Sequence, residues 1–283
     1  MVRGLACIAL IAAMAILGGS AHATWPRPAA GDSASGDPEV IFTFDDGPHE
    51  TRTVPILDEL RRRNIKAIFF WVGYRVAKNG KHRDLRRRLV ERAVADGHII
   101  GNHTINHVHL CSISRELAAR EIDVNARIFE KLTGQPQLLF RAPYGNHCPR
   151  LVSMLHERHL GHVFWDIDPR EWEHKDAKRT ASAVIRKLKK LRGRAVILLH
   201  DTKPASVRAL PRILDWIEEE NARRVKDGRR PIRILDGSDL MAERIGPELT
   251  NWANATARDA RDAVATAISR LVPGYRLRAI TRR

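Results

Sequence analysis

The sequence predicts an α/β fold with one main domain, a distorted parallel barrel of the (β/α)7 type, and three observations lead there. From residue 40 onward, short β-branched and apolar runs alternate with longer segments of helical periodicity. Strict alternation of this kind gives a parallel sheet, because right-handed crossovers return the chain to the same end of the sheet. The chain has 283 residues, 43% of them hydrophobic, which is enough for one sizeable core.

Seven short segments are predicted to be strands, because each is rich in apolar or β-branched residues and is bounded by turn signals. Gly97, for example, directly precedes the third segment. In chain order the expected strands are residues 40–44, 66–72, 98–101, 138–141, 162–167, 195–199 and 231–235.

The segments between the strands carry helical signals. After the first strand, apolar residues between positions 54 and 60 recur at the spacing of one buried helix face. Ser114 suits the N-cap of a long helix, and Gly134 follows the end of that helix. The later helices are expected at residues 84–95, 114–132, 149–158, 177–191 and 207–224, and one more amphipathic helix at 259–271.

The chain is expected to divide into four regions. Residues 1–23 are predicted to be a signal peptide, because an apolar run of about 13 residues is too short to span a bilayer and Ala21-His22-Ala23 has the form of a cleavage site. Residues 24–38 are rich in Pro, Ala, Gly and Ser and are expected to be a flexible leader. Residues 39–240 form the main domain, and residues 241–283 form a helical tail. We therefore expect an exported protein, periplasmic or secreted, without a membrane span after the signal is removed.

The net charge is +16, and the cations are clustered. A field of this sign attracts polyanions. Because the chain has an export signal and no recognised nucleic-acid motif, we expect an anionic polymer of the cell envelope as partner, and no nucleic acid. The alternative is that the clusters are solvated helix faces without a partner. The clusters are residues 61–63, 83–88, 186–194 and 223–230.

Polar residues gather where five of the expected strands end. Because the carboxyl ends of parallel strands share one face of a barrel, and barrel active sites form on that face, we expect these side chains to meet in one pocket. In chain order they are Asp45 and Asp46; His103 and His107; Arg141 and Tyr144; Asp166, Asp168, Glu171 and Trp172; and His200 and Asp201.

Two histidines in this set suggest a metal site. His103 and His107 are spaced so that one helical turn would place both rings on one face. Two imidazoles with a carboxylate are a usual ligand set of hydrolytic zinc, and Asp46 or Asp45 can supply the carboxylate. The other Asp is then the candidate base, because no Glu follows the first His as it does in zincins. Zinc is expected, cobalt and nickel suit the same ligands, and non-haem iron oxygenases form a rival class with this set.

These residues resemble the polysaccharide deacetylases of the NodB-homology class, carbohydrate esterase family four, over about residues 40–235. Residues 43–48, Thr-Phe-Asp-Asp-Gly-Pro, are similar to the first motif of that family, in which the first Asp is the base and the second binds the metal. The resemblance therefore implies Asp45 as base and Asp46 as ligand. His103 and His107 match the second motif, which supplies the two histidine ligands.

Three further motifs follow. Residues 141–145 resemble the third, in which Arg141 would orient the base and the backbone N–H of Tyr144 would help to hold the oxyanion. Residues 198–200 resemble the fifth, which implies His200 as general acid. Residues 165–172 resemble the fourth with one departure: the family has an Asp that contacts the acid His, where this chain has Glu171. Glu171, Asp166 or Asp168 could make that contact, and Asp201 could orient His200 or cap the next helix.

The resemblance implies a metal-dependent hydrolase that removes N-acetyl groups from an acetylated polysaccharide and releases acetate. Peptidoglycan, a chitin-like oligomer or an exopolysaccharide would each be a suitable substrate. The expected substrate contacts are Pro143, Tyr144, Trp172 and Leu198, with Trp172 as an apolar wall and Leu198 in the acetyl pocket. The alternative is a degenerate module that binds glycan without chemistry, which would be marked by loss of the base, a ligand or the acid.

Two cysteines remain after signal removal, Cys111 and Cys148. An even pair in an oxidising compartment favours a disulfide, and two buried free thiols are the alternative. Both cysteines follow expected strand ends on the pocket side, so that a bridge would brace the rim of the pocket.

Overall fold

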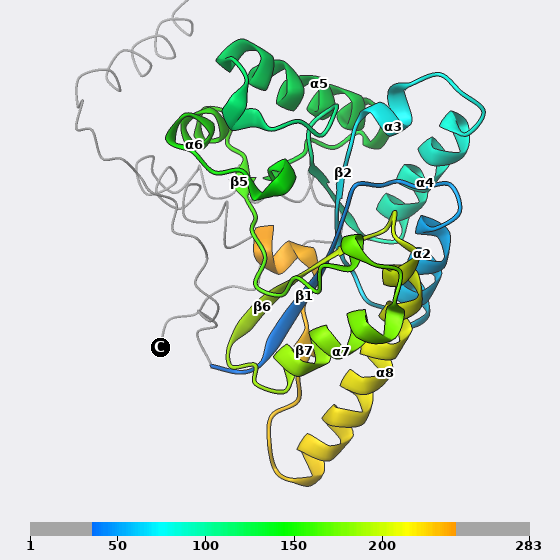
Figure 1. The fold of residues 1–283 in the computed structure, drawn as a ribbon. Coiled ribbons are helices and arrows are strands. Elements are labelled where there is room, and N and C mark those ends of the chain that lie inside the picture. Colours follow the sequence, from blue (N-terminus) through cyan, green and yellow to red (C-terminus); the bar gives the residue numbers. More distant parts are fainter. Residues whose placement is uncertain (1–35, 242–283) are drawn as a thin grey trace, which may run out of the picture.

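Strand β1 (Glu39–Asp45) lies inside the sheet, and all of its residues are buried. It pairs in parallel with β6 (Arg194–His200) along one edge and with β2 (Ile68–Trp71) along the carboxyl-terminal part of the other edge. Strand β7 (Arg233–Ile234) pairs with the first two residues of β1. The computed structural model describes residues 36–241, and the strand order is β5-β4-β3-β2-β1-β6 (Figure 1).

The strands on the β5 side of the sheet are short. They are β3 (Ile99–Asn102), β4 (Leu139–Phe140) and β5 (Gly161–His162). The predicted strand over residues 162–167 is therefore wrong beyond residue 162. Instead, the chain crosses to the opposite edge of the sheet, where Ile167 pairs with Ile197 of β6. The segment after β5 thus curls the sheet toward closure, which confirms the expected distorted parallel barrel.

Helices cover the outer face of this curled sheet. The helices α7 (Ala177–Leu188), α8 (Pro204–Lys226), α2 (Thr53–Arg62), α4 (Arg83–Ala95) and α5 (Arg115–Thr133) each pack against the next in this order. Figure 1 shows α7 beside α8. Two further helices in the described residues are α6 (Pro149–His156) and the short α3 (Tyr74–Ala77). Of these two, the periodicity predicted only α6. Short 3₁₀ turns are η2 (Leu110–Ser112), η3 (Pro143–Gly145) and η4 (Glu171–Glu173).

Alternate residues of β1 pack into different layers. Phe42 and Phe44 pack with the helices, whereas Ile41 packs inside the curled sheet against Phe70 and other apolar residues. Because strand residues alternate between faces, Thr43 and Asp45 continue the inner face that Ile41 begins. The inner face of the central strand therefore ends in a carboxylate at the carboxyl end of the sheet.

The expected signal peptide and the expected helix at 259–271 lie outside the described residues, as does nearly all of the expected leader. Within residues 36–241, none of the helices has the length and the apolar character needed to cross a membrane.

Candidate active site

Two residues of the site, Asp45 and His200, come from neighbouring strands. Asp45, the last residue of β1, is in register with His200, the last residue of β6. Side chains in register on adjacent parallel strands point to the same side of the sheet, so both face the inside of the barrel. The fold therefore places a candidate base and a candidate acid on adjacent strands although they are far apart in the chain.

Asp46 joins them through an unusual backbone conformation. If the strand continued, Asp46 would point to the opposite face from Asp45. Instead Asp46 has a φ of 74°, in the left-handed region that few non-glycine residues adopt, and the chain turns there. The next residue must be Gly47, because an added Cβ would lie 2.1 Å from the Asp201 carboxylate. This turn leaves two consecutive carboxylates at one site.

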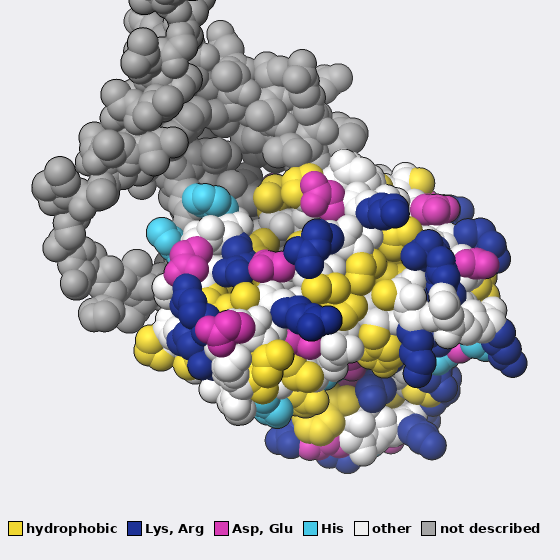
Figure 2. Space-filling model, turned by 90° about the horizontal axis from the view of Figure 1, so that it is seen from above, with side chains coloured by type: hydrophobic (Ala, Val, Ile, Leu, Met, Phe, Trp, Pro, Cys, Tyr) yellow, Lys and Arg dark blue, Asp and Glu magenta, His cyan; other side chains and the backbone are white. Residues whose placement is uncertain are grey.

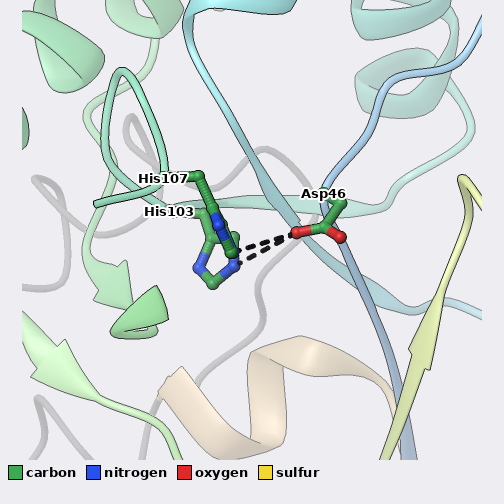
Figure 3. Close-up of side chains that lie close together, drawn as sticks. All are labelled: Asp46, His103 and His107. Atoms are coloured by element: carbon green, nitrogen blue, oxygen red, sulfur yellow. Dashed lines mark ion pairs between the residues drawn. The ribbon is translucent and has the colours of Figure 1, made fainter. Parts of the chain in front are cut away.

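The prediction that His103 and His107 share a helical turn is wrong. The segment between them forms no helix, and Thr104 and His107 have φ angles of 64° and 56°. The loop folds back on itself, and the His107 N–H donates to Thr104 Oγ1 at 3.0 Å. The two rings still lie together, with centroids 4.9 Å apart, and Figure 3 shows both directed at Asp46.

Helix α5 holds this loop through buried polar side chains that the sequence analysis missed. Glu121 accepts from the backbone N–H of Asn106 at 2.9 Å and from its side-chain amide at 2.8 Å. Asn125 donates its amide to the carbonyl oxygens of Thr104 and Trp71. Two polar residues on an otherwise apolar helix face were the only sequence signal for this role.

The triad of Asp46, His103 and His107 fits a single divalent ion. Asp46 Oδ1 lies 3.2 Å from His107 Nε2 and 3.6 Å from His103 Nε2, and all three ligand atoms lie within 4.8 Å of one another. Two ligands about 2.1 Å from one ion at a tetrahedral angle are about 3.4 Å apart, which matches this spacing. His103 Nδ1 donates to the carbonyl of Arg141 at 2.7 Å, which leaves the Nε2 lone pair directed at the site.

The pKa shifts of His107 and Asp46 suit a metal as well. Burial and the neighbouring His103 lower the pKa of His107 to about 4, so that this ring is neutral near pH 7 and has a free lone pair. Burial acts to raise the pKa of Asp46, but the hydrogen bond with His103 and the nearby imidazoles hold it well below its usual range. The triad therefore presents a neutral His107 ring and an ionised Asp46 carboxylate.

Arg141 fixes Asp45 beside the triad. Its fully buried guanidinium donates through Nη1 to Asp45 Oδ1 at 2.8 Å and to Thr43 Oγ1 at 2.7 Å. Its other nitrogens donate to backbone carbonyls, and the ring of Phe70 lies 4.3 Å from Cζ. The second Asp45 oxygen lies 3.8 Å from His103 Nε2. One carboxylate oxygen is thus anchored, and the other faces the triad.

Glu171 makes the contact with His200 that the sequence left open among three carboxylates. Glu171 Oε1 accepts from His200 Nδ1 at 2.9 Å, from the His200 backbone N–H at 2.7 Å and from Ser206 Oγ at 2.8 Å. Asp166 and Asp168 instead accept from the backbone N–H groups of Val196 and Arg170.

This contact changes the proton affinity of His200. Burial lowers the pKa of the ring, but the hydrogen bond with Glu171 and the negative charge of that carboxylate outweigh burial and raise the pKa to about 9. Burial acts to raise the pKa of Glu171, and its hydrogen bonds with His200 and Ser206 hold it below the ordinary value. The pair is therefore a protonated imidazole beside a carboxylate at neutral pH.

Asp201 neither contacts the His200 ring nor caps the next helix, the two roles that the sequence suggested. The N-cap of α8 is Lys203, and the hydrogen bonds of Asp201 within the described residues go to Thr53 and Trp71 rather than to His200. Thr53 Oγ1 donates to Asp201 at 2.5 Å and accepts from the His49 N–H at 2.7 Å. Burial raises the pKa of Asp201 to about 7. Asp201 therefore ties the end of β6 to the start of α2 and the end of β2, and through Thr53 to the loop that follows Asp46.

The rim of the site combines exposed aromatic rings with a covalent link. Tyr144 is 59% exposed and stacks on His109 with centroids 3.9 Å apart, while Trp172 is 46% exposed. A disulfide joins Cys111 of η2 to Cys148, the residue before α6. The other two expected substrate contacts, Pro143 and Leu198, are buried below this rim.

Comparisons with known proteins give the family. The profile of the polysaccharide deacetylases matches residues 32–164. A peptidoglycan-N-acetylglucosamine deacetylase of Bacillus cereus is 31% identical over 207 residues, which cover 71% of this chain and 89% of that relative. The chain belongs to the polysaccharide deacetylase family. A chitooligosaccharide deacetylase of Sinorhizobium fredii is 34% identical over 173 residues, 61% of this chain and 76% of the relative.

Solved structures of this deacetylase family share the fold. A family 4 carbohydrate esterase from Streptomyces lividans superposes with a TM-score of 0.57 at 30% identity, over 65% of this chain and 89% of that one. A family pseudoenzyme from Bacillus anthracis superposes with a TM-score of 0.61 at 20% identity, over 72% and 65%. Because the family holds both enzymes and a pseudoenzyme, the activity of this chain has to be argued from its own side chains.

Proposed function

We propose that this chain is a metal-dependent N-deacetylase that hydrolyses the acetamide of sugar residues in a polysaccharide and releases acetate. The proposal depends on one observation: Asp45 and His200, in register on adjacent strands, lie at the same carboxyl end of the sheet as the metal triad. A carboxylate and a protonated imidazole beside a metal triad are the groups that hydrolysis of an amide needs.

The residues of the chain have separate tasks in this reaction. Asp46, His103 and His107 would hold an ion, zinc in our proposal with cobalt or nickel as alternatives, and this ion would polarise the acetyl carbonyl and lower the pKa of a water. Asp45 accepts the proton of that water as its oxygen forms a bond to the carbonyl carbon. Arg141 keeps the other Asp45 oxygen in place. The Tyr144 N–H helps to hold the negative oxygen that develops.

His200 completes the reaction. Its protonated ring donates to the sugar nitrogen as the carbon–nitrogen bond breaks, which yields acetate and a free amine. A pKa of about 9 keeps this proton on the ring at neutral pH, and Glu171 orients Nδ1 so that Nε2 faces the leaving group. Leu198 lines the acetyl pocket, Pro143 is a further substrate contact, and Trp172 forms an apolar wall for the sugar.

The two rival functions give specific expectations. A degenerate glycan-binding module would have lost the base, a ligand or the acid, whereas here the departure at Glu171 preserves the contact with His200. An iron oxygenase would use the same triad, but it would leave the Asp45–Arg141 and His200–Glu171 pairs without a task. Oxygen consumption in an activity assay would separate that class from a hydrolase.

The experiment that tests the proposal is Asp45→Asn, with acetate release measured on peptidoglycan, on N-acetylglucosamine oligomers and on an acetylated exopolysaccharide. Loss of the base should cost about 10²-fold or more while the metal content is unchanged. Asp58→Asn, which changes an exposed carboxylate on the outer face of α2, is the matched control and should retain wild-type rates. Wild-type acetate release by metal-loaded Asp45→Asn would show that another group is the base.

The location of the protein is part of the proposal. We infer export to the periplasm or the cell exterior from the expected signal peptide, and the Cys111–Cys148 disulfide supports an oxidising compartment.

A further inference from the structure

Helix α7 and the turn after it form a surface of one charge. Residues 177–192 contain no Asp or Glu, and all of their Lys and Arg side chains are exposed. In the part of the chain that the structure describes, none of these cations forms an ion pair or a side-chain hydrogen bond. We call this set the α7 cationic stripe: Lys178, Arg179, Arg186, Lys187, Lys189, Lys190 and Arg192.

Other helices of the chain neutralise their cations. On α2, Arg62 pairs with Glu59 at 2.8 Å, and on α8, Arg224 pairs with Glu220 at 3.0 Å. On the face shown in Figure 2, Lys and Arg side chains lie scattered among hydrophobic and acidic ones. The α7 cationic stripe therefore differs from the pattern of the other helices, and net charge alone does not account for it.

Helix stability does not explain the stripe either. Cations in the last turn of a helix, such as Arg186 and Lys187, interact favourably with the helix dipole. Lys178 and Arg179 lie in the first turn, where a positive charge is unfavourable. Asp176 caps that turn by accepting from the backbone N–H groups of both residues. These two side chains make the helix less stable, which favours a role in binding.

The stripe begins near the active site. The buried residues Ala181, Val184 and Leu188 pack α7 onto the domain, so the cations project from the opposite, solvent-facing side. Helix α7 follows η4, which holds Glu171 and Trp172, and it runs antiparallel to β6 because it leads to the start of that parallel strand. Lys178 and Arg179 thus lie at the end of α7 that follows Trp172, and the other five cations lie at the far end of this helix of about 18 Å and in the turn after it.

We propose that the α7 cationic stripe binds an anionic polysaccharide and, taking the proposed function as given, that this is an acidic stretch of the N-acetylated substrate polymer. Two groups of cations along one helix, the first of them beside a glycan site, fit a linear polymer with repeated carboxylates. A lipid surface fits less well, because α7 buries its apolar residues and residues 177–192 expose no large hydrophobic side chain.

The test uses hyaluronan, a linear polymer of N-acetylglucosamine and glucuronate, as the anionic probe. The stripe variant carries Lys178→Gln, Arg179→Gln, Arg186→Gln and Lys187→Gln. The control variant carries Arg62→Gln, Arg115→Gln, Arg223→Gln and Arg229→Gln, which removes the same charge from exposed positions elsewhere. Binding of the full chain to hyaluronan and to vesicles of phosphatidylcholine and phosphatidylglycerol is measured at low and high salt.

We expect wild type to bind hyaluronan in a salt-sensitive way, the stripe variant to bind at least about tenfold more weakly, and the control variant to change by less than about threefold. Equal losses in both variants, or no loss in either, would overturn the proposal. Tighter binding to the anionic vesicles through the same four side chains would assign the stripe to lipid and would also overturn it.

Acetate release separates this proposal from the function on which it rests. On neutral N-acetylglucosamine oligomers, the stripe variant should keep the kcat and KM of wild type, because none of its changed residues lies at the triad. If neither wild type nor variant releases acetate from any substrate, the deacetylase proposal fails while hyaluronan binding still reports on the stripe.

Discussion

Glu171→Gln tests the division of labour between His200 and its partner. The substitution keeps the size of the side chain and removes the charge that holds the proton on the His200 ring. The pKa of that ring is raised from 6.5 to about 9 in the folded protein. At about 1.4 kcal/mol for each tenfold change in proton affinity, this corresponds to about 3 kcal/mol in favour of the protonated ring. Without the carboxylate, burial is the dominant remaining effect, and it lowers the pKa.

The assay is acetate release against pH. A general acid with a pKa of about 9 is about nine-tenths protonated at pH 8, whereas one at 6.5 or below is about 3% protonated or less, so we expect at least about 30-fold lower activity at pH 8. The deficit should shrink as the pH falls toward the lower pKa of the variant ring, because a growing fraction of that ring then carries the proton. The descending limb of the profile therefore moves from near pH 9 to below pH 7.

Glu173→Gln is the matched control for this change. Glu173 lies on the same 3₁₀ turn as Glu171, but it pairs with Arg170 and makes no bond to His200. Its substitution should leave the descending limb in place. A Glu171→Gln profile that still falls near pH 9 would refute the idea that Glu171 sets the acid.

Three further outcomes are expected. A chelator should abolish acetate release and added zinc should restore it; full activity in a metal-free sample would rule out a role for the Asp46 triad. Cys148→Ser should lower the free energy of unfolding by about 4 kcal/mol, because the bridge closes a loop of 37 residues. The measurement is a urea titration without reductant, and an unchanged urea midpoint of unfolding would mean that the bridge does not form. Thr53→Val keeps the shape of the side chain but removes the donor to Asp201, so the free energy of unfolding should fall by about 1–3 kcal/mol. Thr51→Val, at an exposed site, is the control and should change the free energy of unfolding little.

The fold and the grouping of the site could be predicted because both follow from patterns that a sequence displays directly. Apolar runs show where strands end, and parallel strands place their carboxyl ends on one face. The bonds that fix the site could not be predicted in this way, since they join residues far apart in the chain. Thr53 and Asp201 are 148 residues apart, and Asp45 and Arg141 are 96 apart. No local periodicity reports such a pairing.

The predicted helical turn between His103 and His107 was wrong for a physical reason. Spacing alone cannot distinguish a helical turn from a loop that returns to the same place. Here Thr104 and His107 have positive φ angles, which cost energy for non-glycine residues and persist only where the surroundings enforce them. Glu121 on α5 supplies that constraint by accepting from the Asn106 N–H, and Asn125 on the same helix by donating to the Thr104 carbonyl.

The departure at Glu171 shows why a motif has to be judged by its contacts. A glutamate where the family has an aspartate could signal lost chemistry, yet the carboxylate reaches both the ring and the backbone N–H of His200. Ser206, in the first turn of α8, donates to the same oxygen and so holds the longer side chain in place. Because Glu171 is buried and accepts two hydrogen bonds from His200 of β6 and one from Ser206 of α8, its position is set by both elements. A change of motif residue that preserves the charge next to the His200 ring preserves the property that a general acid needs.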